Sequence, residues 1–122
     1  MKTITIDGVE YNLTPIKKTE AIILEQHLKF EVYPEDLGQY SWNYAKIMCA
    51  ELGDGWRLPT KEELNLMYLN RGAIGGFAAA YYWSSSEFNY CLAWNQFFNY
   101  GNQYHSNKNY TYFVRAVRSL SI

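Results

Sequence analysis

The side chains best suited to molecular recognition are concentrated between Tyr81 and Arg118 of the 122-residue chain. Tyrosine, phenylalanine, asparagine and serine dominate this segment, and the only formal charges from residue 81 to residue 113 are those of Glu87 and Lys108. A tyrosine side chain supplies a large contact area and loses little conformational entropy on binding, whereas asparagine and serine supply adaptable hydrogen bonds. The composition is typical of a recognition surface and not of a catalytic centre.

The residue pattern does not indicate a catalytic site or a metal-binding site. No Ser/His/Asp arrangement, phosphate-cradling glycine loop or carboxylate pair in a cleft can be placed on the sequence. His27 and His105 are isolated, without a second metal ligand at a suitable spacing. Cys49 is expected to be a buried thiol and Cys91 a free thiol, with no disulfide between them. We therefore expect no enzyme activity, no metal and no cofactor.

Length, charge and the first residues exclude several classes of protein. A chain of this length can bury its own core, so we expect one domain over 1–122. A net charge of -1 without a basic stripe argues against a nucleic-acid partner. The start of the sequence has no apolar segment of the signal-peptide or transmembrane type. We expect a product that is made in the cytoplasm and is not inserted in a membrane.

The residues ahead of the recognition segment predict the first elements of an α+β domain. Alternating apolar residues predict a β-hairpin over 1–16 with a turn at Asp7-Gly8. Residues 17–27 favour neither helix nor strand. Apolar spacing then predicts a helix over 42–52, with Ser41 as a candidate N-cap.

A second helix is predicted over 61–70, because Thr60 and Glu63 have the spacing of a capping box. Gly72 is expected to end this helix and to begin a loop of small residues up to residue 80.

Short strands are expected over 81–83, 93–98 and 113–118, joined by long polar loops that carry function. Period-2 alternation places Trp94 and Phe98 toward the core and the intervening side chains toward solvent. The outward set expected from this alternation is Asn95, Phe97 and Asn99.

Three motifs carry a resemblance to a known family: residues 55–60 (GWRLPT), residues 82–85 (YWSS) and residues 114–118 (VRAVR). Together with the spacing of residues 42–53, they resemble the bacterial and phage branch of the C-type lectin-like fold. Within that branch the sequence is most similar to the variable proteins of diversity-generating retroelements. The resemblance extends over residues 28–120 and implies two helices packed on short antiparallel strands, with long ordered loops.

In that family, adenines of a template are copied with errors into the 3′ end of the gene, so that asparagine codons become codons for Tyr, Phe, Ser, Cys, His or Leu, among others. The resemblance therefore implies a diversified ligand-binding region over 88–113, between scaffold residues such as Trp83, Trp94, Gly101 and Lys108. The implied ligand-binding residues are Phe88, Tyr90, Cys91, Leu92, Asn95, Phe97, Asn99, Tyr100, Tyr104, His105, Ser106, Asn107, Tyr110, Tyr112 and Phe113.

The resemblance implies a non-enzymatic receptor-binding or adhesion protein, whose ligand is a protein or a glycan on a cell surface. Without a signal peptide, a phage or prophage product incorporated into a phage particle is favoured. Two alternatives stay open: an assembly module of a phage fibre tip that buries the aromatic face in a homo-oligomer, and a calcium-dependent sugar-binding lectin. The second alternative would need clustered carboxylates, and the recognition segment has one acid, Glu87.

Overall fold

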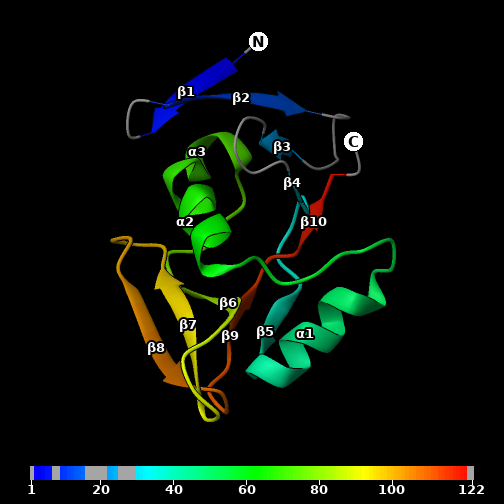
Figure 1. Cartoon of the computed structure of the whole chain (residues 1–122), viewed down its shortest axis with the longest axis vertical. Coiled ribbons are helices and arrows are strands. Elements are labelled where there is room, and N and C mark those ends of the chain that lie inside the picture. Colours follow the sequence, from blue (N-terminus) through cyan, green and yellow to red (C-terminus); the bar gives the residue numbers. More distant parts are fainter. Residues whose placement is uncertain (1, 7–8, 16–21, 25–29, 121–122) are drawn as a thin grey trace.

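The described part of the chain forms two five-stranded sheets and three helices (Figure 1). The computed structural model describes residues 2–6, 9–15, 22–24 and 30–120. The helices span Trp42–Glu51 (α1), Lys61–Leu69 (α2) and Arg71–Ile74 (α3). This architecture confirms the predicted α+β class.

The first sheet is antiparallel throughout. Its strands, in spatial order, span Lys2–Ile6 (β1), Val9–Pro15 (β2), Ile22–Leu24 (β3), Phe30–Val32 (β4) and Val117–Ser119 (β10). The alternating residues near the N-terminus thus form two paired strands, whereas the turn predicted at Asp7-Gly8 lies outside the described residues. The segment 17–27, which favoured neither helix nor strand, contains β3 in its described part.

The second sheet carries most of the recognition segment. Its strands, in spatial order, span Gly38–Tyr40 (β5), Tyr112–Val114 (β9), Tyr81–Glu87 (β6), Leu92–Phe97 (β7) and Gln103–Asn107 (β8). Neighbours in this sheet are antiparallel except β6 and β9, which run parallel where Tyr82 lies opposite Phe113. The sheet is therefore mixed, and β7 and β8 form a hairpin at one end of it.

The two strands around residues 113–118 correct a prediction. One strand was expected there, but the chain leaves the second sheet after β9 and enters the first sheet at β10. The break falls at Arg115 and Ala116, where the Ala116 carbonyl accepts a hydrogen bond from the Tyr33 amide at 2.9 Å. This segment therefore joins the two sheets, and β9 is the interior strand.

Helices α1 and α2 begin at the predicted residues, but only α2 has an N-cap whose side chain makes a capping hydrogen bond. Thr60 Oγ1 accepts from the Glu63 amide and the Glu63 carboxylate accepts from the Thr60 amide, so the capping box is confirmed. Ser41 occupies the N-cap position of α1, but its side chain makes no capping bond within the described chain. The Trp42 amide donates instead to the Lys108 carbonyl at 2.9 Å, so a loop from the recognition segment caps this helix.

The end of α2 differs from its prediction. The helix ends at Leu69 with Asn70 as its C-cap, and α3 follows at once and contains Gly72. The Asn70 carbonyl accepts from the amides of Ala73 and Ile74, and these bonds start a new turn. The predicted loop of small residues is therefore confined to the residues after α3.

Side chains of β6 point alternately into two core clusters. Trp83 packs with Trp42, Ala45 and Cys49 of α1, whereas Tyr82 packs with residues of α2. The two helices consequently cover opposite faces of the second sheet. We call these the α1 face and the α2 face.

The burial of the tryptophans corrects a second prediction. Trp42 and Trp83 are buried, at 3% and 0% exposure. Trp94 was expected in the core but is half-buried, as is Trp56. Trp94 lies under the Lys61 ammonium group, whose Nζ is 3.6 Å from the ring centroid, because the N-terminus of α2 covers this part of the sheet with a long polar side chain.

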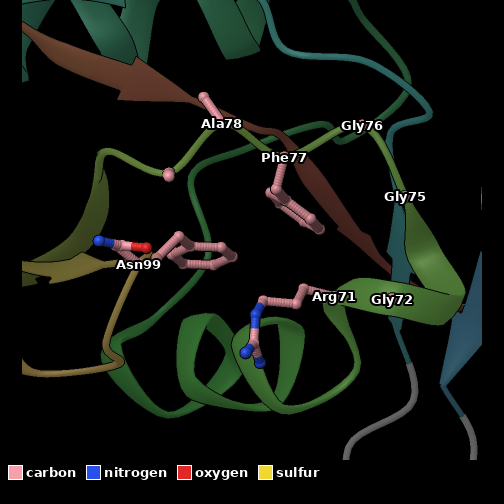
Figure 2. Close-up of a pocket in the computed structure, with 9 residues that line it drawn as sticks. Arg71, Gly72, Gly75, Gly76, Phe77, Ala78 and Asn99 are labelled. Atoms are coloured by element: carbon pink, nitrogen blue, oxygen red, sulfur yellow. The ribbon is translucent and has the colours of Figure 1, made fainter.

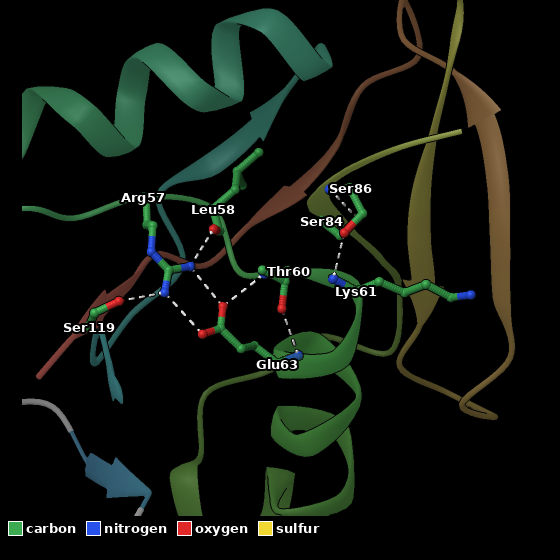
Figure 3. Close-up of polar contacts among 8 residues, drawn as sticks. All are labelled: Arg57, Leu58, Thr60, Lys61, Glu63, Ser84, Ser86 and Ser119. Atoms are coloured by element: carbon green, nitrogen blue, oxygen red, sulfur yellow. Dashed lines mark hydrogen bonds and ion pairs between the residues drawn. The ribbon is translucent and has the colours of Figure 1, made fainter. Parts of the chain in front are cut away.

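Two half-buried arginines hold the first sheet, and one of them also links it to α2. Arg57 donates to both carboxylate oxygens of Glu63, at 2.7 and 2.9 Å, and to Ser119 Oγ of β10 (Figure 3). Burial raises the pKa of Glu63, but hydrogen bonds from Arg57 and Thr60 outweigh it and leave that pKa below its ordinary value. Arg118 pairs with Glu31 at 2.7 Å. Arg57 and Arg118 are therefore structural partners of carboxylates.

Candidate ligand-binding face

Three stacked rings cross the α1 face at right angles to the strands. Phe97 of β7 lies opposite Tyr81 of β6, and Tyr112 of β9 follows on the far side of Tyr81. The Tyr81 ring centroid is 4.5 Å from that of Phe97 and 5.0 Å from that of Tyr112, with interplanar angles of 23° and 25°. Both flat faces of Tyr81 are thus covered by neighbours. We call Phe97, Tyr81 and Tyr112 the aromatic row.

Each ring of the row touches one exposed tyrosine. Tyr100 packs against Phe97 (5.7 Å between centroids), Tyr104 against Tyr81 (6.2 Å) and Tyr110 against Tyr112 (6.1 Å). These rim tyrosines are 75%, 45% and 56% exposed, in that order, whereas the row itself is half-buried. A half-buried apolar floor with exposed tyrosines around it has the anatomy of a binding hot spot.

A polar group lies beside the row. Asn95 was predicted to point to solvent, but it is 1% exposed, because Tyr104 and Ser106 of β8 and Tyr112 of β9 surround it. Its Nδ2 donates to Ser106 Oγ at 2.9 Å, and the Tyr112 hydroxyl donates to the same oxygen at 3.1 Å. Asn95 Oδ1 is buried without a hydrogen-bond partner among the described residues. Such an unpaired acceptor is uncommon in a folded protein.

The α2 face carries a second aromatic group at the same end of the sheet. The His105 imidazole stacks on Phe88 with 3.9 Å between centroids and meets the Trp94 ring edge-on at 5.1 Å. Phe88 is half exposed, and His105 is exposed. We call Phe88, His105 and Trp94 the Phe88 cluster. Because neighbouring residues of a strand point to opposite faces, β8 supplies Tyr104 to one group and His105 to the other.

The loop between β6 and β7 is held by one lysine. Lys108 Nζ is 2.6 Å from Glu87 Oε2 and 2.9 Å from the Tyr90 carbonyl, and it lies over the Trp42 ring. The Lys108 bond lowers the pKa of the exposed Glu87 carboxylate. Tyr90 itself is 90% exposed. The two formal charges between residues 81 and 113 therefore neutralise each other and fix a loop that displays a tyrosine.

The remaining predicted site residues are distributed over several places. Cys91 and Leu92 are half-buried where the loop enters β7, and Asn107 is half-buried at the end of β8. Phe113 packs on Tyr82, at 5.4 Å between centroids, and joins the core on the α2 face. Phe113 therefore does not belong to either aromatic group.

Asn99 lies apart from the aromatic row and lines an open pocket of about 440 Å³ next to α3. The wall of this pocket includes Phe77, Phe98, Arg71 and the glycines of the α3 turn (Figure 2). The Arg71 guanidinium is held over the Tyr68 ring and donates to the Tyr68 carbonyl. Asn99 is the one predicted site residue in the lining.

Tyr81 belongs to the candidate site, although it is not among the ligand-binding residues implied by the sequence. Alternation along β6 could have separated Tyr81 from Tyr82, because Tyr82 points into the core under α2 and Tyr81 points the other way. The missing information was which neighbouring strands would lie beside Tyr81.

Titratable groups in the described chain offer little for catalysis. No three His, Cys, Asp or Glu side chains of the described residues are grouped closely enough to hold a metal ion. Burial raises the pKa of the Cys49 thiol to about 12, so this thiol stays protonated at neutral pH. None of the described helices is both long and apolar enough to span a bilayer. The arrangement is suited to binding through rings, hydroxyls and amides.

Comparison with known families gives one match over most of the chain. A family model described as the Lcl C-terminal domain matches residues 17–118. No curated protein matches the chain. The matched region contains both helices that carry the core, all of the second sheet and both aromatic groups. The chain therefore belongs to the Lcl C-terminal domain family and has a C-type lectin-like fold.

Proposed function

We propose that this protein is a non-enzymatic receptor-binding or adhesion module, whose ligand-contacting surface is diversified by a retroelement. The ligand is a protein or glycan on a cell surface, and the module acts at the exterior of a phage or a bacterium. Membership of a lectin-like family supports a binding role. Diversification by a retroelement, binding to a cell-surface receptor and a place on a phage or bacterial surface go beyond family membership and are proposed here.

The observation that carries the proposal is the identity of the residues in the two aromatic groups. Apart from Tyr81 and Trp94, every member of the row, the rim and the Phe88 cluster occupies a position of the implied diversified set. Residues interleaved with them, such as Gln96 and Phe98, are buried. Along β7 the pleat thus places the half-buried Phe97 on the α1 face and the buried Gln96 on the opposite face.

The charge pattern supports a recognition surface whose affinity comes from buried contact area and not from ion pairs with the ligand. Glu87 and Lys108 pair with each other, so affinity must come from apolar burial and hydrogen bonds. Tyrosine anchors with few rotors commonly dominate such interfaces.

The genomic part of the proposal is tested by sequencing the DNA beside the gene. We expect a near-identical repeat of the 3′ coding segment with asparagine codons at the positions of the rim tyrosines and the Phe88–His105 stack, next to a reverse-transcriptase gene. A flanking region without such a repeat would contradict the retroelement origin.

The binding part is tested with fluorescently labelled protein on a panel of intact bacterial strains. We expect the triple variant Tyr100→Ala, Tyr104→Ala, Tyr110→Ala to lose at least tenfold in cell-associated signal on any strain that binds the unmodified chain. The matched control is the double variant Ile47→Ala, Leu69→Ala, because both side chains are exposed on helices outside the face. Equal loss in the control, or no loss in the triple variant, contradicts the proposal.

A further inference from the structure

The outer strand of the second sheet has an open edge. β8 pairs with β7 on one side, and no strand of the described chain pairs with it on the other (Figure 1). An edge strand presents unpaired amide and carbonyl groups that can pair with another chain. β8 is therefore a potential template for an added strand.

Two hydrogen bonds determine which backbone groups of β8 are free. The Phe97 amide donates to the Asn102 carbonyl, and the Lys108 amide donates to the Cys91 carbonyl, both at 2.9 Å. In an antiparallel ladder every second pair exchanges hydrogen bonds, and the register between these ends is regular. Tyr104 and Ser106 therefore direct their backbone groups to β7.

The backbone groups of the alternate residues point away from the sheet. Gln103 and His105 each present an amide and a carbonyl at the edge, and Asn107 presents an amide, since its carbonyl accepts from Tyr110. These groups recur at every second residue, which is the spacing of an extended polypeptide. Carbohydrates have no matching repeat of donors and acceptors.

The devices that normally protect an edge strand are missing from β8. Its sequence, Gln103–Asn107 (QYHSN), contains no lysine, other formally charged residue or proline, and its register with β7 has no bulge. Proteins usually block an exposed edge with such features or keep the edge strand very short. At the opposite end of the sheet, β5 is only three residues long.

The two aromatic groups lie on either side of this edge. A residue opposite Tyr104 on an added strand would point to the α1 face, beside the rim and the aromatic row. The next residue, opposite His105, would point to the α2 face, beside the Phe88 cluster. In recognition by strand addition, main-chain bonds supply affinity and contacts to alternate side chains supply specificity.

The stacking within the row also favours a polypeptide over a sugar. A sugar ring packs on an open aromatic face, and both faces of Tyr81 are occupied by Phe97 and Tyr112. This floor presents ring edges and hydroxyl groups, which suit the side chains of a peptide.

We propose that the ligand of this protein is an extended polypeptide segment that pairs with the free edge of β8 and places alternate side chains on the aromatic row and the Phe88 cluster. This inference rests on the proposed function and specifies the chemical class of its ligand.

The test compares His105→Pro with His105→Ala. Both changes remove the imidazole, but proline also removes the outward amide that an added strand would use. Because this amide points away from β7, proline at 105 leaves the β7 ladder intact, and the urea midpoint checks that the variant folds. The probes are a yeast-displayed library of linear twelve-residue peptides and an array of neutral glycans.

We expect peptides enriched on the unmodified chain to bind His105→Pro at least about tenfold more weakly than His105→Ala, which corresponds to the loss of one hydrogen bond to an otherwise unpaired group. N-methylation of an enriched peptide at successive amides gives a second readout that does not depend on the folding of a variant. Loss of binding at every second amide is expected, because only alternate amides of an added strand face β8.

Several outcomes overturn the inference and leave the proposed function intact. Peptides that need the rim tyrosines but bind both His105 variants equally, without alternation in the N-methyl scan, would show binding at the face and not at the edge. Glycans bound in place of peptides would identify the other ligand class. A dimer in sedimentation that His105→Pro converts to monomer, without peptide enrichment, would assign the edge to a second copy. Binding that survives the triple rim variant contradicts the proposed function itself.

Discussion

Arg115 directly follows β9, the strand that carries Tyr112 of the aromatic row, but the surroundings of the two differ in kind. The Arg115 side chain is fully buried, and its donors reach Asp36 at 2.8 Å and the carbonyls of Tyr33, Gly75 and Gly76. Those partners come from two separate segments of the chain, residues 33–36 and residues 75–76. Every direction around this guanidinium is therefore specified by the fold.

The aromatic row depends mainly on contacts within one surface. Its rings stack on each other, its rim is exposed, and the Asn95 amide beside it has an acceptor without a partner in the described chain. The rim tyrosines pack on the row and are exposed, so replacing them removes little that the core needs. The comparison indicates that the molecule concentrates its constraints in the scaffold and leaves the face free to vary.

Arg115→Met should have the largest effect on stability. It removes the Arg115 donor from Asp36 Oδ1 and from three carbonyls, although Asp36 Oδ2 keeps the Tyr82 hydroxyl. Breaking a buried pair from one side costs up to about 5 kcal/mol. Chemical denaturation in urea measures the loss. The matched control is Arg118→Met, whose side chain is 30% exposed and should cost clearly less. Equal losses would show that Arg115 is no more constrained than a boundary arginine.

Trp83→Ala should cost about 3–4 kcal/mol, because the indole is fully buried in the α1 cluster and donates to the Tyr40 carbonyl. Trp94→Ala should cost less, about 1–2 kcal/mol, since this ring is half-buried under Lys61. Urea midpoints of the two variants check the order. A larger loss for Trp94 would place it back in the core and contradict its assignment to the Phe88 cluster.

The tryptophans show how far the sequence can predict this fold. Alternation correctly separated the faces of β7 and placed Phe98 in the core, but it could not tell whether a helix would cover Trp94. The capping box at Thr60 was predictable because all of its atoms lie within one turn. The burial of Trp94 depends on how closely α2 approaches, which is a tertiary property.

Two features of the candidate site, the strand β8 and the burial of Asn95, could not be predicted from local sequence patterns. β8 consists of polar and aromatic residues without an apolar alternation, so its strand character comes from pairing with β7. Asn95 was expected to be exposed because the strand and the tyrosine that bury it were not predicted as neighbours. Residue types identified the recognition segment, whereas the pairing of strands decided which of its members meet.

Gly101→Ala should cost about 3 kcal/mol. Gly101 has φ of 90°, and an added Cβ would lie 2.4 Å from Cε2 of Tyr68, so backbone strain and a clash add together. The matched control is Gly53→Ala, which has φ of 74° and open space around the added atom, and should cost about 1–2 kcal/mol. Thermal melting of both variants separates the clash from the strain. Similar shifts would mean that Tyr68 moves aside freely and that the β7–β8 turn tolerates variation.

Glu63→Gln should have a smaller effect that depends on pH. Glutamine retains the capping geometry but loses the ion pair with Arg57, which is about a third exposed, so the cost at neutral pH is about 1 kcal/mol. Because the folded-state pKa of Glu63 lies below its ordinary value, the ionised carboxylate stabilises the fold above about pH 4.3. This contribution is lost as the pH falls through the folded-state pKa. Urea unfolding from pH 7 to pH 3 should show the difference between the variant and the unmodified chain shrinking; a constant difference contradicts the assignment.

The smallest effect on stability per side chain should come from the variant that changes the most exposed surface. Replacing Tyr90, Tyr100, Tyr104 and Tyr110 together by serine removes four exposed rings, each expected to contribute within about 0.5 kcal/mol. The summed loss should stay below that of Trp83→Ala alone, and thermal melting of the two variants side by side measures it. If the fourfold variant unfolds as readily as Trp83→Ala, the rim supports the core and the division between scaffold and face is wrong. If it melts near the unmodified chain but no longer binds cells, folding and recognition are assigned to different side chains, and a surface of this kind can be exchanged without rebuilding the fold beneath it.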